Sequence, residues 1–242
     1  LEFIRGDFVI SAATVSRFFA LHVIALPLVL VFLVIGHILA LHHVGSNNPD
    51  GIEIKDHLDE NGKPLDGIPF HPYYSVHDTF AVGIFLIIFA LIVFYAPEMG
   101  GFFLETPNFE PANPLATPEH IAPVWYFTPF YSVLRAIPSW FGTQIWGVIG
   151  MGGAIAVLFL LPWLDRSPVK SIRYKGPLTK ILLVLFVISF LILGYLGVLP
   201  ATEGRTLVAR LCTVYYFAFF LLMPIWSKLD KTKPVPTRVT MK

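Results

Sequence analysis

Charged residues are scarce in this chain of 242 residues. Only 14% of the residues are charged, and 17 basic residues nearly balance 16 acidic ones, for a net charge of +1. Nucleic-acid binding is therefore excluded, because it depends on a concentration of basic residues. Cys212 is the single cysteine, so an intrachain disulfide is excluded as well. A starting Met and a signal peptide are also lacking, and we expect Leu1 to lie inside a longer chain.

Long apolar runs are abundant instead, and 55% of the residues are hydrophobic. A run of about 18 apolar residues is long enough to span a membrane as a helix. Five such segments are predicted, at 14–43, 78–96, 142–163, 178–199 and 206–227. Within lipid they must be helices, since every backbone polar group needs an internal partner. The predicted fold is an all-α, multi-pass membrane protein with five transmembrane helices.

Basic residues indicate how the spans are oriented. They concentrate in the loop 165–175 and in the tail after residue 227, which we assign to the cytoplasmic side. The polar loop 44–72 joins that side as an ordered hairpin, whereas the loop between the second and third spans faces outward. We divide the chain into a first span with its flanks (1–77), a second span with the outer loop (78–141) and a three-helix part (142–242).

Two histidines lie inside the first predicted span. His22 and His37 are 15 residues apart, which on a helix is about 22 Å of rise and about 60° of rotation. Imidazoles within a span are costly and usually functional, and imidazole is a ligand of haem iron. Alternatively, each histidine hydrogen-bonds to a neighbouring helix. The separation is too great for one shared zinc ion. Pro27, between them, is expected to kink the helix.

Six ordered motifs make the chain resemble a known family. They are RFFALH (17–22), HILALH (37–42), GSNNPDG (45–51), HPYYSVHD (71–78), PANPLATPEHIAPVWYF (111–127) and YSVLRAIP (131–138). They are similar to cytochrome b of the quinol–cytochrome c oxidoreductase (cytochrome bc) complex. The resemblance implies that the five spans correspond to the last five helices of an eight-helix haem-binding subunit. The first three helices, which carry the other histidine of each haem pair, would then lie outside this chain.

The same resemblance implies two b-type haems. His22 would ligate the iron of the outer, low-potential haem, and His37 that of the inner, high-potential haem. The 15-residue spacing resembles the chloroplast type, which affects the relative rotation of the haems. Arg17 could approach a haem propionate, or it could be an interface arginine that keeps its head group in water.

An inner quinone site is implied near the cytoplasmic ends of the first two spans. His42 and Asp78 would contact the quinone, with His77 as a weaker candidate. A histidine and a carboxylate at the mouth of an apolar pocket can hydrogen-bond quinone carbonyls and deliver protons. Alternatively, Asp78 caps its helix.

An outer quinol site is implied around Pro123, Val124, Trp125 and Tyr126, with Tyr131 lining it. A one-electron oxidised quinol is reactive, so its pocket should be rigid, apolar and shielded from water. Proline removes backbone freedom, and aromatic rings supply rigid walls. For Trp125 and Tyr126 the alternative is a membrane-interface aromatic belt.

Val124 stands where many family members carry a glutamate that is proposed to bind quinol and move its proton. Valine can do neither. We hypothesise that Glu119 or His120, a few residues upstream, accepts the proton instead. The alternative is that both residues lie at a helix start or on the surface.

The favoured function is therefore a membrane redox subunit. It oxidises quinol outside and passes electrons through two haems to an inner quinone, coupled to proton translocation in a bacterial inner membrane. The implied partners are an iron–sulfur protein, a cytochrome c-type subunit, lipid and a second copy of the complex. The alternatives are a two-haem quinone-reactive anchor of another dehydrogenase or reductase, and a haem-free transporter. Transporters often show inverted repeats, which this sequence lacks.

Overall fold

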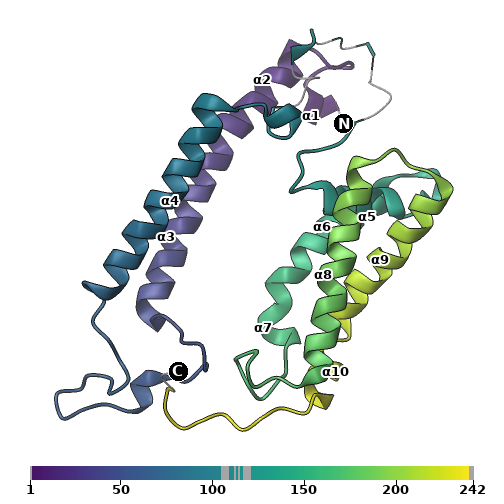
Figure 1. Ribbon diagram of the computed structural model, residues 1–242. Helices are drawn as coiled ribbons and strands as arrows, with labels where there is room; N and C mark the ends of the chain where they lie inside the picture. Colours follow the sequence, from purple (N-terminus) through teal and green to yellow (C-terminus); the bar gives the residue numbers. More distant parts are fainter. Residues whose placement is uncertain (1, 105–108, 112, 114, 117–120, 240–242) are drawn as a thin grey trace. The chain divides into compact units, whose positions relative to one another are not determined.

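The structure is a computed structural model that describes residues 2–104, 109–111, 113, 115–116 and 121–239. Within these residues the secondary structure is helical, and the only β pairing is an isolated bridge between Leu58 and Pro64. The prediction of an all-α protein is confirmed. Figure 1 shows the helices, coloured by their position in the sequence. The chain forms two compact units. The first unit is Leu1–Asn48 with Glu110–Glu119, and the second unit is Pro49–Phe109 with His120–Lys242.

The first unit contains one long apolar span. The short helix α1 (Glu2–Arg5) precedes α2 (Ala12–Ala20), which continues through a π-helical turn (Leu21–Ala25) into α3 (Leu26–Val44). The 33 residues of Ala12–Val44 are long and apolar enough to cross a membrane. The first predicted span, at 14–43, is thereby confirmed. Gly45 ends the helix with a φ of 90°, and its amide donates to the Leu41 carbonyl.

The irregularity expected at Pro27 takes the form of the π turn just before it. The Leu26 amide donates to the Leu21 carbonyl, five residues back, instead of to the carbonyl of residue 22. Proline has no amide hydrogen, and its ring crowds the carbonyl four residues earlier. Widening the preceding turn relieves that crowding, and π turns are rare enough to mark a special position in a helix.

The second unit carries the remaining spans. Helix α4 (Tyr73–Tyr95) is the second span, and α8 (Pro177–Val198) is the fourth. The third span, Ile145–Leu164, joins α6 (Ile145–Ala156), a 3₁₀ turn and α7 (Leu161–Leu164). These boundaries agree with the predicted segments to within a few residues.

The fifth span, predicted as one helix at 206–227, is bent. Helix α9 (Glu203–Leu221) and helix α10 (Met223–Leu229) meet at an angle of 64°. Pro224 lies in the first turn of α10, where its missing amide costs no helical hydrogen bond. It cannot continue the hydrogen-bond ladder of α9, so the chain bends there.

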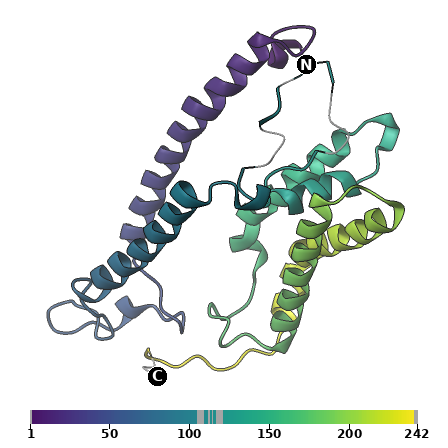
Figure 2. The same ribbon diagram turned by 45° about the horizontal axis from the view of Figure 1, so that its top comes forward.

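A short helix in the outer loop organises the core of the second unit. Helix α5 (Thr128–Ala136) contacts α6, α8 and α9, and α8 and α9 also lie side by side (Figures 1 and 2). Its Val133 is buried in one cluster with Ala154 and Leu193. The backbones approach closely here, because a Cβ atom added to Gly197 of α8 would collide with the Thr128 carbonyl of α5. Thus α5 is fixed between three spans.

Candidate functional site

His22 and His37 lie on the same span of the first unit. His22 is in the π turn and His37 is in α3, and both residues are exposed. The described residues supply no hydrogen-bond partner to either ring. An imidazole that faces an apolar environment needs a partner for its ring nitrogens. Two such imidazoles at different depths of one span fit a pair of haem ligands.

The π turn changes the expected angle between the two histidines. A π turn takes more residues per turn than an α turn, so each of its steps rotates the chain by less than about 100°. The turn spans Leu21–Ala25, so it includes His22 and the first three residues that follow it toward His37. The rotation between the imidazoles is therefore smaller than the roughly 60° expected from a regular helix. The two positions therefore lie more nearly on one side of the span.

Arg17 makes its contacts with other residues of the first unit. Its guanidinium donates a hydrogen bond to the Phe3 carbonyl, and it lies against Gly6, whose φ of +80° suits only glycine well. These contacts tie the lead-in residues to α2. Glu2 and Asp7 line the same small cavity as Arg17. A propionate contact of Arg17 remains a proposal, because the contacts of this arginine account for its position locally.

The inner-site candidates belong to different units. His42 lies in the last turn of α3 in the first unit, whereas His77 and Asp78 lie on α4 in the second, and all three are exposed. The cap alternative for Asp78 is wrong. Helix α4 begins at Tyr73, with Pro72 as the preceding cap residue, so Asp78 lies in its second turn. A carboxylate there cannot reach the free amides of the first turn.

A buried carboxylate that the sequence did not reveal anchors the loop before α4. Asp50 is 2% exposed; it accepts a hydrogen bond of 2.7 Å from the Tyr174 hydroxyl and pairs with Arg173 at 3.2 Å. The Ser171 hydroxyl donates to the Pro49 carbonyl at 2.6 Å. The only sequence signal was the NPDG turn at 48–51, which predicts a turn but no partner. These contacts join the segments 49–51 and 171–174.

The PVWY segment of the outer loop forms a turn that leads into α5. The Phe127 amide donates to the Val124 carbonyl at 2.9 Å, and the Thr128 hydroxyl donates to the Trp125 carbonyl at 2.6 Å. The Trp125 ring stacks on Phe102, with centroids 5.7 Å apart and planes 16° apart. Pro123 and Val124 are half-buried, whereas Trp125 and Tyr126 are exposed. The rings therefore form a partly open aromatic surface beside α5.

Tyr131 lies on α5 beneath a cation. The Arg135 guanidinium carbon is 5.1 Å from the centre of the Tyr131 ring. The same guanidinium donates to the carbonyls of Leu196 and Leu199, at 2.7 and 3.0 Å, where α8 ends. The last carbonyls of a helix have no intrahelical donor, so Arg135 satisfies two of them. Glu119 and His120 lie outside the described residues.

Two family models match the chain. One is described as "Cytochrome b(N-terminal)/b6/petB" and matches residues 1–129; the other is described as "Cytochrome b(C-terminal)/b6/petD" and matches residues 111–217. The chain belongs to the cytochrome b family. It is thus an integral, multi-pass membrane protein, and the family resemblance drawn from the motifs is confirmed.

Individual relatives agree with this membership. The chain is 61% identical over 241 residues to cytochrome b of Allochromatium vinosum, covering 98% of this chain and 58% of that protein. It is 45% identical over 236 residues to cytochrome b of Rhodospirillum rubrum, covering 97% of this chain and 54% of that protein. This cytochrome b chain therefore spans about half the length of these curated relatives.

A solved structure is similar along nearly the whole chain. It is a "Hyperthermophilic respiratory Complex III", with a TM-score of 0.80 and 37% sequence identity. The similarity covers 94% of this chain and 55% of that one. At this identity and score the similarity extends to the fold, which agrees with the family membership.

Proposed function

We propose that this chain is part of a membrane redox subunit that oxidises quinol at an outer site and reduces quinone at an inner site through two b-type haems. The observation that carries the proposal is the pair His22 and His37 on one apolar span, without partners among the described residues. Each quinol oxidised outside releases two electrons and two protons. Each quinone reduced inside takes up two electrons and two protons, so the two reactions move protons across the membrane.

His22 and His37 would hold the two haem irons, one at each depth of the span. When bound, the haems would supply one-electron redox centres between the two quinone sites. The second ligand of each iron would come from outside this chain. The π turn sets the backbone conformation at His22, and the apolar residues that flank both histidines would exclude water from the bound groups. Arg17 is the nearest cation in sequence to His22 and is the candidate for a propionate.

The outer site would use the aromatic surface beside α5. Trp125, Tyr126 and Tyr131 supply flat walls, and Pro123 restricts the backbone that carries them. Val124 provides only an apolar contact, so the quinol proton needs another acceptor. We assign that role to Glu119, with His120 as the alternative, from the sequence alone. Rigid walls and exclusion of water would protect the one-electron oxidised quinol from side reactions.

The inner site would use His42 together with Asp78, and His77 beside it. A hydroxyl or carbonyl of the quinone can accept a proton from an imidazolium and hydrogen-bond to a carboxyl group. All three side chains are exposed at helix ends, where water can resupply protons. The segment 165–175, with four basic residues and one acidic residue, supports a cytoplasmic assignment for that side.

The partners follow from this chemistry. Outward electron transfer needs an iron–sulfur protein, because the cluster cannot be built from the single Cys212 of this chain. A cytochrome c-type subunit would accept that electron, and further helices of the same subunit would complete the haem sites. We place the assembly, as a dimer surrounded by lipid, in a bacterial inner membrane.

The first test is a reduced-minus-oxidised spectrum with a redox titration on the purified complex that contains this chain. We expect two b-type components at separated potentials. His22→Leu should remove the lower-potential component and His37→Leu the higher one, with haem content falling by half in each. His57→Leu changes a half-buried loop histidine outside the predicted spans; it is the matched control and should keep both components. Two unchanged components in both span variants would refute the ligand assignment and with it the proposal.

A further inference from the structure

A large cavity opens in the second unit, and its lining includes none of the residues assigned to either quinone site. Its volume is about 850 Å³, within the range of about 300–1,000 Å³ usual for small-molecule sites. Its walls come from four helices: α7, the first half of α8, the end of α9, and α10. Residues of the segment 165–175 also line it. The lining residues that matter here are Asp165, Lys170, Lys175, Leu183, Phe186 and Trp226.

The interior of the cavity is apolar and preformed. Phe186 of α8 stacks on Phe219 of α9, with ring centroids 4.5 Å apart, and Trp226 of α10 lies 5.2 Å from Phe219. The Trp226 indole donates to the Phe219 carbonyl at 3.0 Å, which holds the ring in place. Leu183 and Met223 complete the wall. Such a surface suits a hydrocarbon chain, and its fixed rings lower the ordering cost of binding.

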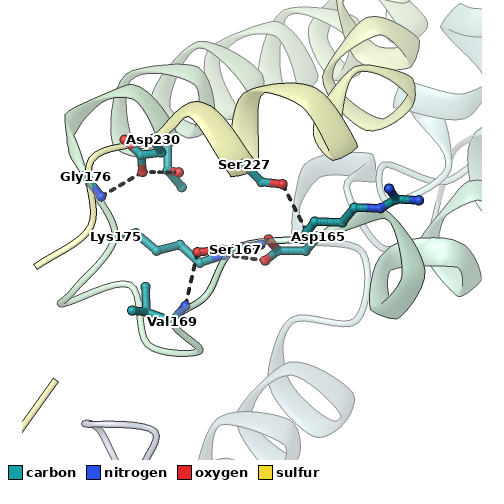
Figure 3. Close-up of polar contacts among 9 residues, drawn as sticks. Asp165, Ser167, Val169, Lys175, Gly176, Ser227 and Asp230 are labelled. Carbon is teal, nitrogen blue, oxygen red and sulfur yellow. Dashed lines mark hydrogen bonds and ion pairs between the residues drawn. The ribbon is translucent and has the colours of Figure 1, made fainter. Parts of the chain in front are cut away.

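The rim of the cavity is polar and braced by hydrogen bonds (Figure 3). Lys175, whose side chain is only 11% exposed, is ion-paired with Asp165. The Ser167 amide donates to the Asp165 carboxylate at 3.0 Å, and the Arg166 amide donates to the Ser227 hydroxyl at 3.0 Å. The segment that carries the basic residues is therefore held against α10 rather than loosely tethered.

The charge of the rim is positive. The segment 165–175 has four basic residues against one acidic residue, a net charge of +3. The Lys175–Asp165 pair cancels internally, which leaves Arg166, Lys170 and Arg173. Arg173 pairs with Asp50, and of these three residues only Lys170, which is exposed, lines the cavity. Within the part of the chain that the structure describes, the ion pairs do not include Lys170. A cation at the mouth of an apolar cavity, where two spans end, matches the boundary between lipid head groups and tails.

We propose that this cavity binds one anionic membrane phospholipid. An acyl chain would lie against Phe186, Phe219 and Leu183, and the phosphate would lie at Lys170 near the rim. A quinone is a poorer fit, because it is uncharged and gains less from the basic rim than a phosphate does. A second protein helix would have to bury Lys170 and the Asp165–Lys175 pair, at the cost of desolvating them. This site is independent of haem binding and quinol chemistry.

The test measures phospholipid bound by the purified complex that contains this chain. After delipidation in detergent, the complex is titrated with phosphatidylglycerol or phosphatidylcholine, and bound lipids are counted by native mass spectrometry. Lys170→Gln should weaken phosphatidylglycerol binding about fivefold, as expected for one basic residue near a membrane surface. Leu183→Trp fills the cavity and should remove one bound phosphatidylglycerol per chain.

Two matched variants control for nonspecific effects. Lys180→Gln removes an exposed lysine of α8 outside the cavity lining, and Leu185→Trp adds the same bulk to an exposed position of α8. Both should bind phosphatidylglycerol as the parent complex does. An unchanged elution volume in size-exclusion chromatography shows that each variant assembles.

Three outcomes would overturn the proposal. One is equal lipid retention in the Leu183→Trp and Leu185→Trp complexes. Another is equal affinity for phosphatidylcholine and phosphatidylglycerol that Lys170→Gln leaves unchanged. The third is the loss of a protein subunit from the Leu183→Trp complex with no loss of lipid, which would assign the cavity to a protein partner.

Discussion

Arg135 holds its guanidinium carbon 5.1 Å from the ring centre of Tyr131, and both residues are on α5. Four residues apart on a helix, they share one face. The same guanidinium bonds two carbonyls at the end of α8, 61 and 64 residues away in sequence. The position of the Tyr131 ring at the proposed quinol site is therefore coupled to the packing of α5 on α8.

The first prediction concerns this coupling. Arg135→Gln leaves the Leu196 and Leu199 carbonyls without their charged donor, which should cost about 1–3 kcal/mol. Quinol oxidation should fall together with the thermal stability of the complex. Arg135→Lys should be intermediate, because one ammonium group cannot reproduce the guanidinium fork. Arg205→Gln, which removes an exposed bond to the Pro200 carbonyl, is the control and should change neither property.

The Tyr131 side of the same contact is tested separately. Tyr131→Phe keeps an aromatic face for Arg135, so stability should stay within about 0.5 kcal/mol of the parent. Tyr131→Leu removes that face and should lower stability by about 0.5–1 kcal/mol. Thermal denaturation of the purified complex measures both. Equal destabilisation by phenylalanine and leucine would show that the hydroxyl, and not the ring face, is what matters.

The buried Asp50 gives the next prediction. Asp50→Asn removes the charge that Arg173 and the Tyr174 hydroxyl face, and it should cost about 1–3 kcal/mol locally. The segment 49–56 should then be cut faster by proteases added to the cytoplasmic face of membrane vesicles. Asp56→Asn changes an exposed carboxylate of the same loop and should leave cleavage unchanged. Similar cleavage rates in the two variants would mean that the Asp50 contacts do not order the loop.

A second buried carboxylate, that of Asp230, follows the end of α10 and accepts hydrogen bonds from the start of α8. It accepts a hydrogen bond from the Gly176 amide at 2.7 Å (Figure 3). It also accepts hydrogen bonds from the Leu178 amide at 3.2 Å and the Thr179 hydroxyl at 2.6 Å. Burial, the largest single influence, raises the pKa of Asp230, but the hydrogen bonds from Thr179, Gly176 and Leu178 together hold that pKa below the ordinary 3.8. A negative charge at a helix N-terminus is favourable in addition.

The pH dependence follows from that direction. Because the folded pKa of Asp230 is lowered, its contribution to stability is complete above the ordinary value of 3.8 and is lost as pH falls through the lowered value. Asp230→Asn should therefore destabilise the protein by about 1–3 kcal/mol at neutral pH, because the amide nitrogen of asparagine cannot accept the hydrogen bonds that one carboxylate oxygen accepts. The difference from the parent should stay constant between about pH 5 and 8. A difference that disappears between those values would contradict the assignment, and thermal melts across this range measure it.

The spans were predictable because a long apolar run is a strong local signal. The segments 78–96 and 178–199 are within a few residues of α4 and α8. The bend after Leu221 was missed, although Pro224 was visible, because a proline near a span end can either begin a helix or break one. Contacts such as Asp50 with Tyr174 join residues 124 positions apart, and no local pattern encodes them.

In the proposed sites, too, some features follow from the local sequence and others only from the packing. His22 and His37 stood out because imidazoles are rare within apolar spans, whereas the π turn that sets their relative rotation depends on how the chain accommodates Pro27. The role of Arg135 could not be predicted from the sequence either, since its partners are backbone carbonyls of another helix. Sequence identifies which residue types are unusual, and packing decides what they contact.

The last prediction concerns the proton acceptor at the outer site. Glu119→Gln should lower quinol oxidation at least tenfold, as expected for loss of a general base, while both haem components persist. Adding Val124→Glu to that variant places a carboxylate in the half-buried turn before α5 and should restore part of the activity. Glu110→Gln, an exposed acid in the same loop, is the control. Full activity in Glu119→Gln would exclude Glu119 and make His120→Leu the next variant. Loss without rescue by Val124→Glu would assign Glu119 a structural role, because a base at the quinol should be replaceable by another carboxylate within reach of the same proton.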